Sequence, residues 1–226
     1  MKRLDKHENS TLKSYFYEKT GMYIDKDQIK KLPEIDTLID IGVGDMGTPD
    51  LYERFPDQKL ILIDPLLESK NYVLKNLSHR DHDFFLTCLG KEKGEIKMNI
   101  EEKKTRSTIL KVTDLNNQGG LFEERFVEIN TLDNILKDLN NLGKLGIKID
   151  TEGYELEVIL GAKETLKTTK FVMAEVRHNH ESFQGCYKLH HFMEAMRENK
   201  FQLSMIVTAK PLIADLVFQP ITDLQF

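Results

Sequence analysis

Two short apolar runs, 37–41 and 59–64, are separated by a glycine cluster and by a segment, 49–55, that can form a helix. Continuous apolar runs of this length are typical of strands buried on both faces of a parallel sheet. A third strand is expected at 83–89, after a helix whose apolar face carries Leu67, Leu74 and Leu77. Strands that alternate with helices predict an α/β fold with right-handed crossovers.

The same alternation returns in the second half of the chain, after a less regular middle. Thr131 can cap a helix whose apolar positions run to Leu142. Further helices are expected over 155–166 and 189–196. The expected strands are 95–100, 125–129, 145–149, 171–176, 201–207 and 212–218. Only a short turn at Lys210-Pro211 joins the last two strands, so they must pair antiparallel.

The length of 226 residues suits one domain with a short appendage. We expect residues 1–33 to be a helical appendage, with Ser10 as a helix cap, and residues 34–226 to be the main domain. The appendage could pack across an edge of the domain, cover a pocket as a lid, or make a contact in a homodimer. The sequence is compatible with all three roles.

The composition excludes several classes of protein. A net charge of −5 argues against a general nucleic-acid binder. The two cysteines, Cys88 and Cys186, cannot build a disulfide framework. No apolar stretch approaches the roughly 18 residues that a membrane helix needs, and the first residues resemble no signal peptide. We therefore expect a soluble cytoplasmic protein that does not insert into membranes.

Glycines at 42, 44 and 47 follow the first strand in the spacing GxGxxG, and Asp64 ends the second strand. An acid at that place can accept hydrogen bonds from both ribose hydroxyls of a nucleoside. Asp40 and Asp45 flank the loop, and both would repel the pyrophosphate of a dinucleotide. They would suit the ammonium group of S-adenosylmethionine. A tight turn without a ligand and a nicotinamide-dependent oxidoreductase are the competing interpretations.

A second group of polar residues follows the strands at 145–149 and 171–176. Asp150 and Glu152 come directly after the first of these strands, and Glu175 ends the second. His178 and His180 lie just beyond. Because ligands bind outside the carboxyl ends of parallel strands, these residues form a candidate site. Helix capping by Asp150 would explain one acid but not two acids around a glycine.

These segments together resemble the FkbM family of S-adenosylmethionine-dependent methyltransferases. The matching stretches are LIDIGVGDMGTPDLYERFP, LILIDP, TLDNIL, IKIDTEGYELEVILGA and FVMAEV. The resemblance covers roughly residues 37 to 218, and the fourth stretch is its most specific part. It implies a Rossmann-like class I fold, with a mostly parallel seven-stranded sheet, an antiparallel last strand and helices on both faces. It also implies O-methylation of a hydroxyl on a sugar, a sugar-containing metabolite or a glycan.

The resemblance implies that the glycine loop binds the cofactor, that Asp64 binds its ribose, and that the turn after residue 149 lines the reaction centre. The residues expected to bind S-adenosylmethionine are Asp40, Gly42, Val43, Gly44, Asp45, Gly47, Asp64, Pro65 and Asp150. The third strand ends in Cys88-Leu89-Gly90 without the acid that many class I enzymes use near adenine. Contacts to the adenine ring therefore remain unassigned.

A sugar hydroxyl is a weak nucleophile, so a general base is expected. We predict that His178 or Asp150 takes the proton, because imidazole ordinarily titrates near neutral pH while an aspartate more readily orients the hydroxyl. The expected catalytic set is His178, Asp150, Glu152 and Glu175. Its three acids could also hold magnesium or manganese, which we do not favour.

The acceptor is expected to be a small molecule or a glycan. The candidate acceptor-binding residues are Arg106, Ser107, Arg177 and His180. The two arginines would suit an anionic acceptor, although we favour the interpretation that they are solvated surface charges. A domain that binds the cofactor without catalysis stays open as an alternative.

Overall fold

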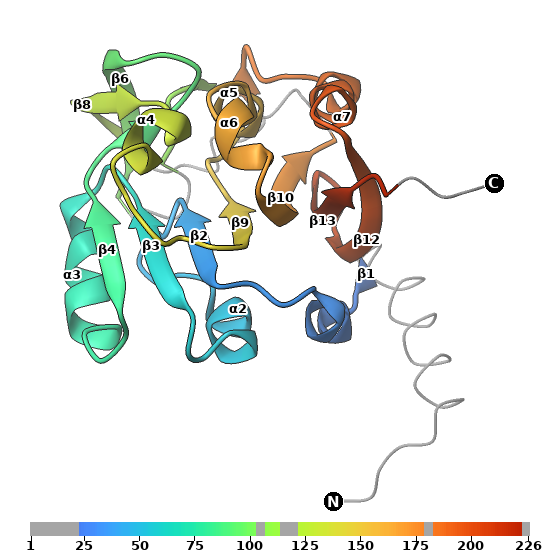
Figure 1. Cartoon of the computed structure of the whole chain (residues 1–226). Coiled ribbons are helices and arrows are strands. Elements are labelled where there is room, and N and C mark those ends of the chain that lie inside the picture. Colours follow the sequence, from blue (N-terminus) through green and yellow to red (C-terminus); the bar gives the residue numbers. More distant parts are fainter. Residues whose placement is uncertain (1–22, 103–106, 114–121, 179–182, 223–226) are drawn as a thin grey trace, which may run out of the picture.

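The central sheet is built from the apolar runs of the sequence, and its order is β1-β12-β13-β10-β9-β2-β3-β4 (Figure 1). The computed structural model describes residues 23–102, 107–113, 122–178 and 183–222. In sheet order the strands are β1 (Tyr23–Ile24), β12 (Phe201–Ala209), β13 (Ile213–Pro220), β10 (Thr169–Arg177), β9 (Leu145–Ile149), β2 (Thr37–Ile41), β3 (Lys59–Ile63) and β4 (His82–Phe85).

Strands β4, β3, β2, β9 and β10 pair parallel, whereas β13 pairs antiparallel with both β10 and β12. The expected Rossmann-like sheet with an antiparallel last strand is therefore confirmed. An additional two-residue strand, β1, extends the sheet at β12, where Tyr23 lies opposite Ala209.

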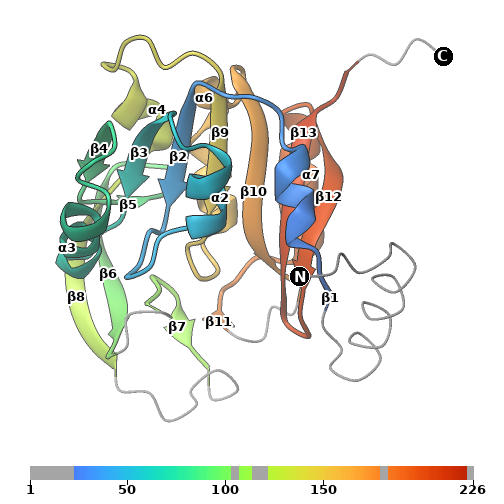
Figure 2. The same cartoon turned by 90° about the horizontal axis from the view of Figure 1, so that it is seen from below.

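Helices cover both faces of the sheet, because alternate residues of each strand point to opposite sides (Figure 2). Leu38 of β2 joins the cluster that contains side chains of η1, α2 and α3. Ile39 and Ile41 join the cluster on the other face, which contains side chains of α4 to α7. The helices are η1 (Lys26–Lys31), α2 (Pro49–Arg54), α3 (Leu67–Asn76), α4 (Leu132–Leu136), α5 (Glu155–Leu160), α6 (Lys163–Leu166) and α7 (Leu189–Glu198). None of the helices that the structure describes is long and apolar enough to cross a membrane.

The apolar face predicted for α3 from Leu67, Leu74 and Leu77 is wrong at the first two of these positions. Leu67 and Leu74 are each 57% exposed, whereas Ser69 and Val73 are buried, as is Leu77 just after the helix. Positions 69, 73 and 77 recur every four residues and so share one stripe of the helix. Leu67 and Leu74 are turned roughly 110° from this stripe at 3.6 residues per turn, and both face solvent.

Two predicted helices are shorter than expected. The helix capped by Thr131 ends at Leu136, and Asn141 then adopts a positive φ of 62° in the connection to β9. The helix expected over 155–166 is divided into α5 and α6 at Gly161. A Cβ atom at Gly161 would lie 2.1 Å from the carbonyl oxygen of Gly90, so this close backbone approach requires glycine.

Two small sheets lie beside the carboxyl ends of the parallel strands, and the less regular middle of the chain supplies all but one of their strands (Figure 2). β6 (Gly94–Glu101) and β8 (Phe122–Asn130) form an antiparallel pair, and β5 (Cys88–Leu89) joins β8 in parallel. The expected strand 83–89 is therefore divided between β4 and β5. β7 (Lys111–Val112) pairs with β11 (Phe183–Gln184).

The described part of the expected appendage packs on the main domain. Ile29 of η1 is buried in the same cluster as Leu51 of α2. The helix expected from Ser10 lies outside the described residues.

Candidate functional site

A cavity of about 190 Å³ lies where β2, β3 and β9 end. It is lined by residues 41–48, 63–66, 87–89 and 150–152, together with Met98, Ser107, Ile109 and Tyr154. The glycine loop and the acidic turn, which are about a hundred residues apart in the sequence, therefore meet in one cavity. Asp45, Asp64, Asp150 and Glu152 are among its lining residues, whereas no lysine or arginine is found among the described residues that line it.

The glycine loop packs directly against the end of β9. Gly42 has a φ of +84°, and a Cβ atom there would lie 1.7 Å from the carbonyl oxygen of Asp150. Only glycine satisfies both conditions. The backbone N–H of Gly44 donates to Oδ2 of Asp64 over 2.9 Å. The loop is thus fixed on one side by the acidic turn and on the other by the acid that ends the second strand.

Asp64 is 5% exposed and carries two hydrogen bonds from the backbone. Its Oδ1 accepts from the N–H of Leu66 over 2.8 Å, and its Oδ2 accepts from Gly44. Burial raises the pKa of this carboxyl, although these backbone donors oppose the rise. Each oxygen of a carboxylate has a second lone pair, so Asp64 can accept two further hydrogen bonds from a ligand.

Asp40 lies beneath the loop and does not line the cavity. Its side chain is fully buried, and Oδ2 accepts from the hydroxyl of Tyr52 on α2. Burial raises the pKa of Asp40 to about 6, against the opposing effects of Tyr52 and Lys148. Asp45 is exposed and lines the cavity, as do Val43 and Pro65.

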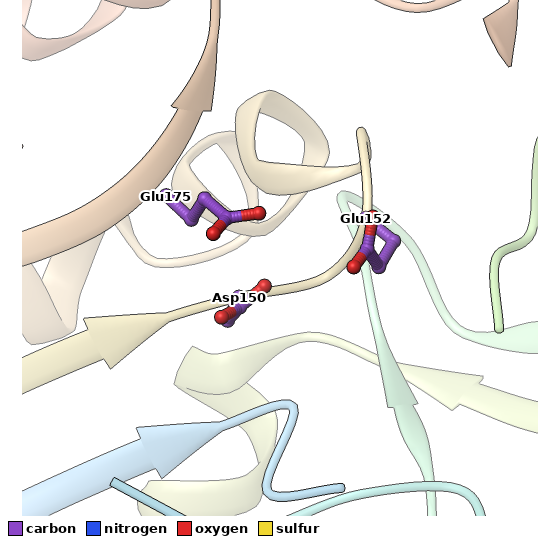
Figure 3. A group of neighbouring side chains, drawn as sticks. All are labelled: Asp150, Glu152 and Glu175. Atoms are coloured by element: carbon purple, nitrogen blue, oxygen red, sulfur yellow. The ribbon is translucent and has the colours of Figure 1, made fainter. Parts of the chain in front are cut away.

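Three carboxyl groups gather at the end of β9 (Figure 3). Asp150 and Glu152 follow β9, Glu175 belongs to β10, and one oxygen of each lies within 4.8 Å of the others. Burial raises the pKa of Glu152 to about 7, although Arg177 opposes the rise. Burial, together with the charges of Asp150 and Glu152, raises the pKa of Glu175 to about 8.

Two buried cations lie beside this acidic group, and both have acidic partners. Nζ of Lys148 lies 3.4 Å from Oδ2 of Asp150 and 3.4 Å from Oδ1 of Asp215. Burial alone would lower the pKa of Lys148, but these acids hold it above its ordinary value. Arg177 is 6% exposed and pairs with the carboxylate of Glu152. The favoured interpretation of Arg177 as a solvated surface charge is therefore wrong.

Of the remaining predicted site residues, some line the cavity and others do not. Ser107 lines the cavity, and its Oγ accepts from the N–H of Glu101 over 3.1 Å. His178 is exposed just after β10, with Nε2 2.8 Å from the carbonyl oxygen of Lys210. A carbonyl only accepts, so Nε2 carries the hydrogen and Nδ1 is the nitrogen able to take a proton. Arg106 and His180 lie outside the described residues.

Sequence reasoning missed several lining residues and the role of one lysine. Cys88 and Met98 belong to the small sheet around β8, with Sγ and Sδ 4.0 Å apart, and Tyr154 precedes α5. Apolar residues in an irregular region give no sequence signal for a cavity. Lys148, in contrast, interrupts the apolar run of β9, and a charge inside a buried strand indicates an ion pair.

Comparisons with known proteins give the family from a family model and support the fold from a solved structure. The chain matches the family model of the methyltransferase FkbM domain over residues 40–203, more than half of its length. The FkbM methyltransferase of Methylobacillus flagellatus is 12% identical, with 84% of this chain and 47% of that chain covered and a TM-score of 0.51. The chain thus spans about half the length of that structure.

Two further solved structures are similar at lower TM-scores. An O-methyltransferase family protein from Burkholderia thailandensis is 10% identical, with 88% of this chain and 56% of that chain covered and a TM-score of 0.49. The O-methyltransferase NcsB1, solved with S-adenosyl-L-homocysteine, is 9% identical, with 94% and 56% covered and a TM-score of 0.46. No curated protein sequence matches. On the family match, the chain belongs to the methyltransferase FkbM domain family, whose methyl donor is S-adenosylmethionine.

Proposed function

We propose that the protein transfers the methyl group of S-adenosylmethionine to a hydroxyl of a neutral sugar or a sugar-containing acceptor. The observation that carries this proposal is a group of three carboxyls: Asp150 and Glu152 line the cavity, and an oxygen of Glu175 lies within 4.8 Å of theirs. Such a group can orient a hydroxyl and accept its proton.

The residues of the cavity fit the cofactor. When bound, S-adenosylmethionine supplies an activated methyl group on a positively charged sulfur. Asp64 has lone pairs for the two ribose hydroxyls, and Cys88, Leu89 and Met98 offer an apolar surface for the adenine ring. The acids that line the cavity suit a cationic ligand. They oppose the dinucleotide pyrophosphate that an oxidoreductase would bind, which argues against that alternative.

We assign Glu175 as the general base that takes the proton of the acceptor hydroxyl. A general base works best when its pKa is near the pH of the reaction, and the pKa of Glu175 is raised to about 8. Asp150 lines the cavity and orients the hydroxyl. Neither Glu175 nor His178 lines the cavity, but one oxygen of Glu175 lies within 4.8 Å of oxygens of Asp150 and Glu152, which do line it. His178 is exposed and is the alternative base through Nδ1.

The distribution of charge favours a neutral acceptor over an anionic one. Lys148 already pairs with two acids, and Arg177 pairs with Glu152. A phosphate beside Asp150 would face repulsion from this carboxylate, whose neighbouring cation Lys148 is already shared with Asp215. Neutral hydroxyl groups can instead donate hydrogen bonds to these oxygens.

An acceptor screen with methyl-labelled S-adenosylmethionine tests this function. We expect labelled product from neutral sugars or glycosides and none from the matched sugar phosphates and nucleotide sugars. Methylation confined to the anionic acceptors, or to amines, would overturn the proposal. A parallel screen with EDTA asks whether a divalent cation joins the three carboxylates, and titration with NADH tests the oxidoreductase alternative.

Two variants then test the assignment of the base on the acceptor found. Glu175→Gln keeps the shape of the side chain but cannot take a proton, so we expect kcat to fall by about 100-fold or more. His178→Gln is expected to retain most of the activity. The reverse pattern would transfer the role of the base to His178.

A further inference from the structure

The turn that carries the acids of the cavity has an unusual backbone. Glu152 has a φ of +52° and Gly153 a φ of +98°. A side chain other than glycine at such a φ is disfavoured by about 1–2 kcal/mol. The surrounding structure must therefore hold the turn in place, and one buried acid accepts three hydrogen bonds from it.

Glu155, at the start of α5, is 1% exposed and does not line the cavity. Its Oε1 accepts from the N–H groups of Thr151 and Gly153 over 3.0 and 2.9 Å, and from the hydroxyl of Thr151 over 3.1 Å. Three donors of the turn thus converge on a single oxygen. This carboxylate binds the two amides on either side of Glu152.

Tyr187 fixes the other oxygen of Glu155 from a distant part of the chain. Its hydroxyl donates to Oε2 over 2.8 Å and accepts from the backbone N–H of Arg177 over 3.3 Å. The ring is 7% exposed and packs on Phe192 of α7, with 5.7 Å between the ring centres. The hydroxyl of Tyr187 therefore connects the turn after β9 with the end of β10, where Arg177 meets Glu152.

We propose that Glu155 and Tyr187 are positioning residues that fix the geometry of the cofactor cavity at the turn after β9. They act through Thr151, Gly153 and Arg177, and thereby place the carboxylates of Asp150 and Glu152. The inference rests on the methyl transfer proposed above but does not depend on which acceptor is used. It predicts that removing one buried hydroxyl outside the cavity weakens cofactor binding.

Tyr187→Phe is the main test, because it removes the hydroxyl and keeps the packed ring. Thr169→Val is the matched control: Thr169 is 2% exposed, its hydroxyl donates to the carbonyl oxygen of Thr165, and it begins β10 at the opposite end from Arg177. The probe is S-adenosylhomocysteine in isothermal titration with the full chain. Amide hydrogen exchange at Thr151 and Gly153 is measured in parallel.

We expect Tyr187→Phe to weaken S-adenosylhomocysteine binding at least threefold and to speed amide exchange at both positions. Thr169→Val is expected to change neither while losing similar stability. A loss below threefold in the tyrosine variant would overturn the inference and leave the hydroxyl a purely structural role. Wild-type protein that fails to bind S-adenosylhomocysteine would instead contradict the proposed function.

Two substitutions of Glu155 keep the test decisive if Tyr187→Phe does not fold. Glu155→Gln retains an oxygen at the same reach for both amides, so binding is expected to stay within threefold of wild type. Glu155→Asp is one methylene shorter and is expected to weaken binding more than threefold. Equal binding by the two variants would show that the reach of this side chain does not set the cavity.

Discussion

Replacing Glu175 with glutamine should change how the free energy of unfolding depends on pH. Burial and the charges of Asp150 and Glu152 raise the pKa of Glu175 to about 8 from its ordinary value of 4.5. Between these two values the folded protein holds a proton that the unfolded chain has released. The unfolded state therefore binds fewer protons, and the free energy of unfolding falls as the pH rises through this window.

The size of the effect follows from the number of protons involved. One proton corresponds to about 1.4 kcal/mol per pH unit, so Glu175 would contribute up to about 3 kcal/mol between pH 5.5 and 7.5. Its carboxyl is only half-buried, and solvent screening reduces that figure. We expect the wild-type protein to lose about 1–3 kcal/mol more than the Glu175→Gln variant over this range.

Urea unfolding at pH 5.5, 6.5 and 7.5, followed by far-ultraviolet circular dichroism, measures the difference; the chain has no tryptophan to report by fluorescence. Glu164→Gln is the control, because Glu164 is exposed on α6 and pairs with Lys167. That variant should follow the wild-type curve. Parallel pH curves for wild type and Glu175→Gln would refute the raised pKa, and with it the reason for choosing Glu175 as the base.

Two further pairs of variants test the cofactor loop and the corrected face of α3. Gly42→Ala should destabilise the fold by more than about 3 kcal/mol, because its Cβ would collide with the carbonyl of Asp150, whereas Gly44→Ala meets open space and loses about 1 kcal/mol through its φ of +59°. Leu74→Gln on the exposed stripe should stay within about 0.5 kcal/mol of wild type, while Val73→Ala should cost about 2 kcal/mol. Thermal unfolding checks both, since about 1 kcal/mol corresponds to roughly 2–4 °C in a chain of this size. Equal losses within either pair would contradict the reasoning.

The strands β2 and β9, in the middle of the sheet, could be predicted from sequence because most of their residues are apolar. β2 and β9 begin and end at the expected residues, 37–41 and 145–149. The helices were harder, because one apolar stripe decides their orientation. In α3 a serine occupies the buried stripe and two leucines face solvent, so the composition of the helix pointed to the wrong face.

In the candidate site, the residues of a local sequence motif could be predicted, whereas the contacts between distant segments could not. Gly42, Gly44 and Asp64 form a local motif, and the structure gathers them at the cavity. The partners of the acidic turn come from far along the chain: Asp215 lies 67 residues from Lys148, and Tyr187 lies 32 residues from Glu155. Spacing within one segment carries no information about such pairs. Only the antiparallel pairing of β13 with β10 brings Asp215 opposite Glu175.

The balance of charge at the carboxyl end of the sheet accounts for the choice of ligand by this glycine loop. Asp45, Asp64, Asp150 and Glu152 line the cavity, and the buried cations nearby, Lys148 and Arg177, are paired with acids. A pyrophosphate would enter this field without a free cation among the described lining residues, whereas a sulfonium enters it with the complementary charge. The same glycine spacing therefore serves two classes of cofactor, and the acids around it decide which one binds.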